Sequence, residues 1–498
     1  MTLEASTRAE LLDQLVRIAH GLGVAEDERG DPATFFKNFL PLPDHARALD
    51  PDIFLILGGR GAGKTALFLL LDFPQGLEAL SGERQLSLPF SASETIWVPA
   101  FGRTHTDFRD FPTPEVQLDP GDRVKLRAYW LGLAVGRLLN RLDRRAPGSE
   151  WAAVLGQQDR DCLRETSRVS QWLPLAVKRL EDVNYSLDTL DRLLAQRRQW
   201  LFLTYDELDR LVPSYLDLGP PIRELLALWL DRWRRWERIR PKIFLRNDLF
   251  REEFLAFPDA SKLRGHKVEL TWQTVSLYRL VAKRMANAGQ ELKRYLERQV
   301  DRLRLRETPP LGLLPDADEA GFRQLMDVLV GTYMGADKRK GITYNWIPNH
   351  LQDGTGKIAP RSFLKLFSLA AERSRTKAAD LKGTALLQPT DLQGALMETS
   401  NDRIRELQEE YPWIEALRGS LRGLEVPAWP KDFRARLSKT QWSTQAQRAL
   451  QDTSPQTVLE LLRNIGVVTV RTDGRLNVPE IYLHGFGLKR KGGIKRPR

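Results

Sequence analysis

A glycine-rich segment contains the residue types that bind phosphate. Residues 58–65 read Gly-Gly-Arg-Gly-Ala-Gly-Lys-Thr and fit the pattern G-x-x-x-x-G-K-[ST]. Glycine lets the backbone N–H groups point inward at phosphate oxygens, where side chains would block the approach. Lys64 should reach the β- and γ-phosphates, and Thr65 should offer its hydroxyl to Mg²⁺. The predicted contacts to ATP in this segment are Gly58, Gly59, Arg60, Gly61, Ala62, Gly63, Lys64, Thr65 and Ala66.

The sequence around this segment predicts the elements that would position it. Ile53–Leu57 is a continuous apolar run, which is typical of a strand buried on both faces of a parallel sheet. Lys64–Phe73 has a helical pattern, so the loop would lie between a strand and a helix N-terminus. The unpaired N–H groups and the positive dipole end of such a helix also favour phosphate.

Two adjacent acids supply a second candidate site. Asp206 and Glu207 follow the apolar run Trp200–Tyr205, which predicts a strand. In P-loop ATPases the first acid holds Mg²⁺ through water, and the second polarises the attacking water. The alternative is an ordinary exposed strand end. A glutamate after the aspartate favours hydrolysis over transfer to another substrate, which argues against a small-molecule kinase.

Further cations are candidates for sensing the nucleotide. Arg246 and Asn247 follow the predicted strand Lys242–Leu245 and could contact the γ-phosphate. The alternative is that Asn247 or Asp248 caps a helix over residues 249–255.

Three other cations could act from more distant segments. Arg361 opens a later helix and could reach back to the nucleotide, although it could equally be a surface arginine. Lys262 and Arg264 precede the predicted strand Lys267–Leu270, where a cation could face a neighbouring subunit.

The order of elements predicts an α/β P-loop NTPase core with a parallel sheet flanked by helices. A helical insertion, a helical lid and a small C-terminal winged-helix-like domain would complete the chain. The expected domains are an N-terminal helical segment at 1–45, the core at 46–272 with its insertion at about 120–198, the lid at 273–430 and the terminal domain at 431–498. Prolines 309, 310 and 315 predict a loop within the lid.

The last segment has its own start and stop signals. Ser454 is a suitable N-cap with Pro455 at the first helical position, and Gly466 is placed to end the helix. Strands at Val467–Val470 and Asn477–Tyr482 should follow, and this order suggests the winged helix.

These motifs together resemble the AAA+-related and STAND-type ATPases of bacteria. The resemblance rests on GGRGAGKT, LFLTYDELDRL, KIFLRND, KVELTW and APRSF, and it runs from about Phe54 to the C-terminus. The stretch VPEIYLHGFGLKRKGG resembles the end of a poorly characterised group among them. The resemblance implies an ATP-driven switch or motor, often acting on nucleic acid, in signalling or in defence against mobile elements. The long insertion departs from a minimal core, and no convincing arginine finger is present.

Composition bears on the partners. The net charge of +11 comes from 76 basic and 65 acidic residues, and six basic residues in the tail, within Lys489–Arg498, account for more than half of it. This excess favours phosphate contacts with nucleic acid, whereas Pro455–Asn464 is nearly neutral and lacks the cations of a sequence-reading helix. A single cysteine and no long apolar run predict a cytoplasmic protein without membrane contact.

Two functions therefore remain open from the sequence. The first is an ATPase that controls engagement of nucleic acid, plausible in antiviral defence. The second is a STAND-type signalling ATPase that gates assembly with a partner protein or a homo-oligomer. ATP and Mg²⁺ are the expected cofactors of both.

Overall fold

The computed structural model describes most of the chain, which forms two compact units. Its described residues are 3–19, 30–83, 86–104, 118–119, 121–142, 150–212, 218–250, 257–381, 383–450 and 452–492. One unit, here called the sheet unit, comprises residues 25–35 and 41–271. The other, here called the helical unit, comprises residues 1–24, 36–40 and 272–498.

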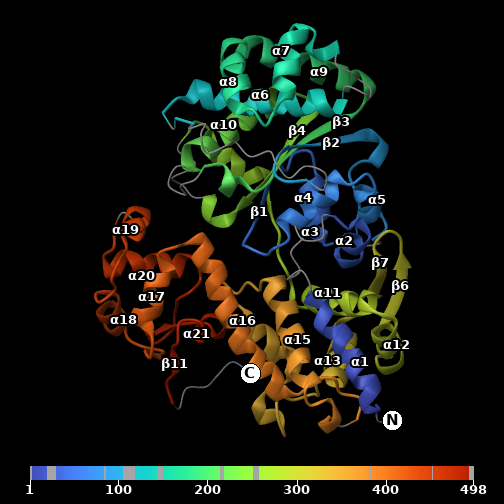
Figure 1. Cartoon of the computed structure of the whole chain (residues 1–498), viewed down its shortest axis with the longest axis vertical. Coiled ribbons are helices and arrows are strands. Elements are labelled where there is room, and N and C mark those ends of the chain that lie inside the picture. The colour runs from blue at the N-terminus through green and yellow to red at the C-terminus, as the bar shows by residue number, and fades with distance from the viewer. Residues whose placement is uncertain are drawn as a thin grey trace. The chain divides into compact units, whose positions relative to one another are not determined.

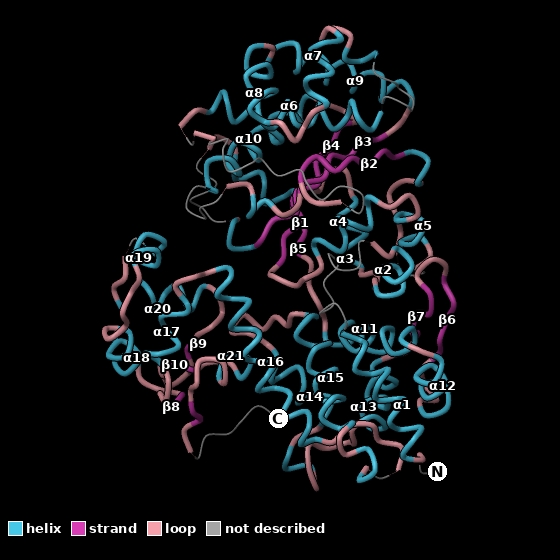
Figure 2. The backbone as a smooth tube through the Cα atoms, in the orientation of Figure 1, coloured by secondary structure: helices cyan, strands magenta, loops and turns pink. Residues whose placement is uncertain are grey.

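A parallel five-stranded sheet forms the centre of the sheet unit (Figure 2). The strands are β1 (Leu55–Gly58), β2 (Thr95–Phe101), β3 (Trp200–Tyr205), β4 (Ile239–Arg246) and β5 (Lys267–Glu269). Their order is β2-β3-β4-β1-β5, and every pairing is parallel. All of β1 is buried because β4 and β5 flank it and helices cover the sheet. The predicted parallel sheet is thereby confirmed, and the carboxyl ends of its strands share one edge.

Helices cover both faces of this sheet (Figure 1). On one face α4 (Lys64–Asp72) packs against β1, β2 and β4. On the other, α6 (Arg123–Leu142), α9 (Leu180–Arg197) and α10 (Gly219–Arg235) pack against β2, β3 and β4. The remaining α-helices among the described residues 30–271 are α2 (Pro32–Asn38), whose last three residues belong to the helical unit, α3 (Pro43–Leu49), α5 (Gly76–Ser81), α7 (Gln157–Arg164) and α8 (Val169–Lys178).

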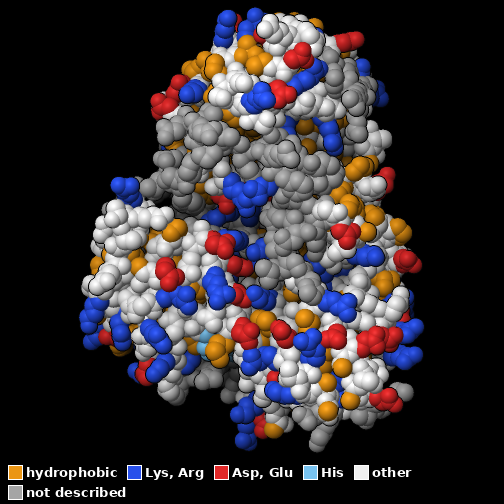
Figure 3. Space-filling view, viewed as in Figure 1, with side chains coloured by type: hydrophobic (Ala, Val, Ile, Leu, Met, Phe, Trp, Pro, Cys, Tyr) orange, Lys and Arg blue, Asp and Glu red, His pale blue; other side chains and the backbone are white. Residues whose placement is uncertain are grey.

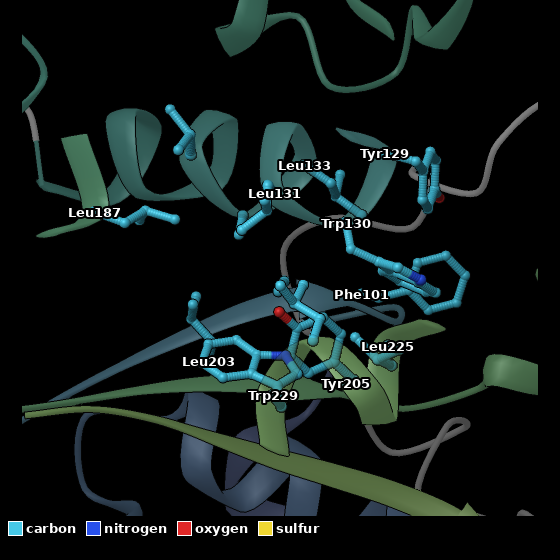
Figure 4. Packing of buried hydrophobic residues seen from close by; sticks show 14 of the residues in the cluster. Phe101, Tyr129, Trp130, Leu131, Leu133, Leu187, Leu203, Tyr205, Leu225 and Trp229 are labelled. Atoms are coloured by element: carbon cyan, nitrogen blue, oxygen red, sulfur yellow. The ribbon is translucent and has the colours of Figure 1, made fainter. Parts of the chain in front are cut away.

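The predicted helical insertion consists of α6 to α9 and shares its core with the sheet. Figure 4 shows Trp130 of α6 facing Tyr205 of β3, with Trp229 of α10 close to the same tyrosine. The Trp130 indole donates to the Pro221 carbonyl at 3.0 Å, which satisfies its buried polar atom. Each such buried aromatic contributes about 1.5–3 kcal/mol from area alone. The insertion is therefore a part of the core that supports β3.

The helical unit is built mainly from helices, and its part before residue 411 also contains one hairpin. Its helices before residue 411 are α1 (Ala5–Val16), α11 (Thr274–Ala288), α12 (Gln290–Gln299), α13 (Glu319–Leu329), α14 (Thr343–Leu351), α15 (Pro360–Arg375) and α16 (Pro389–Glu410). The loop predicted from three prolines is wrong, because β6 (Arg304–Thr308) and β7 (Gly312–Asp316) form an antiparallel hairpin there. Pro309 and Pro310 lie in its turn, and Pro315 lies in a two-stranded sheet, where a missing N–H is tolerated.

The C-terminal part of this unit contains helices followed by a hairpin. Its elements are α17 (Ile414–Leu421), β8 (Glu425–Val426), α18 (Pro430–Leu437), α19 (Thr444–Leu450), α20 (Pro455–Asn464), β9 (Thr469–Val470), β10 (Leu476–Asn477), α21 (Glu480–Leu483) and β11 (Lys489–Arg490). The N-cap prediction is confirmed, since Ser454 Oγ accepts from Thr457 N–H at 3.3 Å. The predicted strand Asn477–Tyr482 is wrong beyond Asn477, because the chain turns into α21.

The VPEIYLHGFG stretch has a packing role. Gly485 N–H donates to Ser400 Oγ at 3.0 Å, and a Cβ on Gly485 would lie only 2.3 Å from Ile404 Cγ1. Glycine is therefore required for α21 to approach α16 closely. Within the described segments, no helix is both long enough and apolar enough to cross a lipid bilayer.

Candidate nucleotide site

The glycine loop connects β1 to α4 in a conformation that glycine makes possible. Gly61 and Gly63 have φ of 74° and 99°, in the left-handed region that side chains disfavour. Ala62 N–H donates to Gly59 O at 3.2 Å, so the loop closes on itself. A Cβ on Gly58 would lie 3.0 Å from the Ala62 Cβ. The loop thus forms a tight bend directly before the first turn of α4.

Lys64 lies at the first turn of α4 and bends back over this loop. Its Nζ donates to the carbonyls of Gly58 and Gly59, each at 2.9 Å. The ammonium is therefore positioned at the mouth of the loop, where a phosphate oxygen could replace a carbonyl as its acceptor.

Asp206 follows β3 and contacts the same loop. Its carboxylate accepts a hydrogen bond from the Thr65 side chain. Asp206 is only 3% exposed, and its buried Oδ2 has no hydrogen-bond partner in the described part of the chain. Buried carboxylate oxygens are normally paired, so an open one beside a hydroxyl fits the oxygen ligands that Mg²⁺ prefers.

Glu207 lies next to Asp206 in an unusual backbone conformation. Its φ of 53° is in the left-handed region, which costs free energy for a non-glycine residue. Its Oε2 accepts from Arg103 N–H at 3.0 Å, and its Oε1 lies 3.4 Å from Arg210 Nε. The carboxylate is held between the segments that follow β2 and β3, at the edge where the glycine loop begins.

The end of β4 lies beside the loop. Arg246 is the register partner of Gly58, and its Nη1 lies 3.7 Å from Asp209 Oδ2. Asn247 Nδ2 donates to Glu269 Oε1 at 2.7 Å, and its buried Oδ1 has no hydrogen-bond partner within the described segments. An amide held in this way presents its oxygen as a fixed acceptor. The alternative role for Asn247, as the cap of a helix over residues 249–255, is left undecided because residues 251–256 lie outside the described part.

Three residues that the sequence did not single out support this edge. Gly102 has φ of 120°, and a Cβ there would lie 3.4 Å from Asp206 Cβ. The Arg103 backbone N–H donates a hydrogen bond to the Glu207 carboxylate, and the Glu269 carboxylate orients Asn247 by accepting from its amide. All three are at or just after the end of a predicted parallel strand. That position is the signal that could have identified them.

The other candidates belong to other segments of the chain. Arg361 belongs to α15 of the helical unit, where its Nη1 lies 3.5 Å from Glu406 Oε1. Lys262 Nζ lies 2.9 Å from Asp259 Oδ1, and the Arg264 side chain is exposed. The sheet unit therefore brings together Gly58–Thr65, Asp206, Glu207, Arg246 and Asn247.

Burial dominates the electrostatics of this site. It raises the pKa of Asp206 to about 7, the negative charge of Glu207 adds to this effect, and the Thr65 hydrogen bond and the Lys64 charge partly offset it. Without a cation on the open oxygen, a charged Asp206 is thus unfavourable in the folded state.

This shift predicts how stability depends on pH. Between about pH 4 and pH 7 the folded chain binds a proton that the unfolded chain releases, so the free energy of unfolding should fall as pH rises. Asp206→Asn should lack this loss and, at pH 8 with EDTA, should be more stable than the wild type by on the order of 1–4 kcal/mol. Urea denaturation at pH 5 and pH 8 measures the free energy of unfolding of each protein. Asp161→Asn, which neutralises an exposed carboxylate, is the control. Equal pH dependence in wild type and Asp206→Asn would contradict the prediction.

The sheet and the loop together define an α/β P-loop NTPase core. The loop lies between β1 and α4, and β4 lies between β1 and the acid-bearing β3. No protein-family model matches the chain, and no curated protein matches it.

Solved structures with low similarity exist. The ORC2 protein of Aeropyrum pernix, in ADPNP–ADP complexes, aligns at 14% identity and a TM-score of 0.32, over 92% of this chain and 98% of its own. The ORC1 protein of Aeropyrum pernix, in complex with DNA, aligns at 14% identity and a TM-score of 0.33, over 91% of this chain and 92% of its own. Similarity at this level carries no functional conclusion for the chain.

Proposed function

We propose that the sheet unit binds Mg·ATP and hydrolyses it. The observation that carries the proposal is the buried Asp206 carboxylate beside the Thr65 hydroxyl. One oxygen of this carboxylate, next to the glycine loop, has no hydrogen-bond partner among the described residues. Thr65 and Asp206 would hold the Mg²⁺, which neutralises developing charge on the phosphates. The backbone N–H groups of Gly59–Ala66 and the Lys64 ammonium would bind the triphosphate.

The residues around this cation site suit hydrolysis. Glu207 would accept the proton of the attacking water after leaving Arg210. Asn247 would orient that water through its open oxygen, since Glu269 already fixes its amide nitrogen. Arg246 would contact the γ-phosphate from its place beside Gly58. Arg361 of the helical unit remains a proposed contact, which would require it to exchange Glu406 for the nucleotide.

We further propose that the nucleotide cycle controls engagement of nucleic acid. The support is the basic excess of the chain and the exposed cations of its C-terminal part. Part of the tail is structural: Arg490 Nε donates to Glu480 at 2.7 Å, while Lys495, Arg496 and Arg498 lie outside the described residues. Nothing in the described part of the chain bears on a defence role or on nucleotide-gated assembly with a partner protein.

An ATPase assay on the pure protein tests both parts. Hydrolysis should require Mg²⁺ and should rise when DNA or RNA is added, and binding of the polymer should weaken steeply with salt. If no polymer stimulated hydrolysis and no salt-dependent binding were found, only the nucleic-acid part of the proposal would be overturned. The signalling alternative would be favoured if the protein retained tightly bound ADP, turned ATP over negligibly and changed its assembly mass when ADP was exchanged for ATP.

A further inference from the structure

The exposed side of α18 has an excess of unpaired positive charge. Lys431, Arg434 and Arg436 of α18 and Lys439, two residues beyond its end, are all exposed, and no acidic side chain of the described segments forms an ion pair with them. Arg434 Nη1 donates to the neutral Gln456 Oε1 at 3.5 Å, so its charge has no acidic partner. The one acid on this helix, Asp432, accepts from Trp429 N–H at 3.2 Å and so caps the helix.

The helical geometry places these cations on one surface. Phe433 and Leu437 are buried against the neighbouring helices α17 and α20. At about 100° per residue, Lys431 faces away from those two side chains, and Arg434 and Arg436 lie on the two flanks of the exposed arc, while Lys439 follows the end of the helix. Figure 3 shows Lys and Arg side chains gathered over the region that Figure 1 labels α18.

The neighbouring elements carry less net positive charge. On α20, Gln456 Nε2 donates to Glu460 Oε1 at 2.7 Å, and the helix carries one acid, Glu460, and one cation, Arg463. In the hairpin, Arg475 and Arg471 lie 2.7 Å and 3.6 Å from the single acid Asp473. Arg422, Arg448 and Arg463 are further exposed cations without an ion pair in the described segments, but each is isolated in the sequence, whereas α18 and the turn after it carry four cations within residues 431–439.

An aromatic ring adjoins this charge. Trp429, the N-cap of α18, is 50% exposed. It is tied to the hairpin because its neighbour Ala428 exchanges two backbone hydrogen bonds with Leu476, at 2.9 Å and 2.8 Å. A Cβ on Gly474, in the hairpin turn, would lie 3.9 Å from the ring. A half-exposed indole next to unpaired cations is the combination that single-stranded nucleic acid uses.

We propose that the exposed arc of α18, together with Trp429, is the surface on which this chain binds the phosphate backbone and an unpaired base of single-stranded nucleic acid. This inference rests on the proposed nucleic-acid function and assigns it to α18 in place of α20 and the C-terminal tail. The cations contact phosphates, and the indole stacks on a base.

The test compares two variants that each remove three positive charges. Lys431→Gln/Arg434→Gln/Lys439→Gln changes α18, and Lys338→Gln/Arg339→Gln/Lys340→Gln changes another exposed basic turn of the same unit. Binding of fluorescein-labelled single-stranded DNA to the full-length protein is followed by anisotropy over a range of salt concentrations. The α18 variant should bind at least tenfold more weakly, and its slope of log K against log salt should fall by roughly 2 units. The control variant should remain within about twofold of the wild type.

The aromatic contact has a different signature. Trp429→Leu should weaken binding of single-stranded DNA about tenfold with an unchanged salt slope, because stacking releases no counterions. If the triple variant unfolds, the single variants Lys431→Gln and Lys439→Gln should each lower the slope by less than 1 unit.

Several outcomes would overturn the assignment. Equal losses in both triple variants would indicate diffuse electrostatics, and wild-type binding by the α18 variant and Trp429→Leu would place the contact elsewhere. If polyglutamate bound as tightly as DNA and was lost in the same variant, the occupant would be an acidic protein. If the wild-type protein bound no polymer, the proposed nucleic-acid function would also be rejected. ATP hydrolysis in the absence of polymer is measured separately and tests the proposed ATPase activity on its own.

Discussion

Lys64→Ala should weaken binding of Mg·ATP by about 10- to 100-fold, because it removes a charge-assisted contact worth about 1.5–3 kcal/mol. The ammonium already lies over the loop, with Nζ 2.9 Å from the carbonyls of Gly58 and Gly59. It is therefore placed to exchange those carbonyls for phosphate oxygens without a large movement. Isothermal titration calorimetry with ATP and Mg²⁺ measures the change.

Lys178→Ala provides the matched control for this experiment. Lys178 ends α8, is exposed and forms no ion pair within the described residues. It should bind ATP as the wild type does. Wild-type affinity in Lys64→Ala would mean that the glycine loop does not hold the triphosphate, and the proposed function would then fail at its first step.

Glu207→Gln should lower the rate of ATP hydrolysis by about 10²- to 10⁴-fold while leaving ATP binding nearly unchanged. Glutamine has the same shape as glutamate and can still accept from Arg103 N–H, so the local structure should persist. It cannot accept the proton of the attacking water. Single-turnover hydrolysis measures the chemical step, and calorimetry on the same variant measures binding.

The control for the second variant is Glu237→Gln, a neutralised carboxylate on the same unit whose side chain is 67% exposed. It should hydrolyse ATP at the wild-type rate. Hydrolysis by Glu207→Gln that stays within a few-fold of the wild type would remove Glu207 from the chemistry. Loss of both binding and hydrolysis would instead assign Glu207 a structural role in holding the segment after β2.

Some features of the site could be predicted because they depend on local sequence. The strand preceding Gly58, the helix starting at Lys64 and the strand Trp200–Tyr205 are each encoded by a short run of residues. The positive φ of Gly61 and Gly63 likewise follows from the need for a tight bend. The hairpin at β6 and β7 was missed because its prolines have the same local signature as a loop.

The sequence alone determined the glycine loop, the two acids after a strand and the alternation of strands with helices, since these arise from spacing and periodicity within short segments. Only the tertiary structure decided that β4 separates β1 from β3, that Arg246 lies beside Gly58 and that Glu269 holds Asn247. It also showed which arginines have acidic partners and which, on α18, have none within the described residues. Pairing between strands and between charges depends on residues far apart in the chain, and no local pattern specifies it.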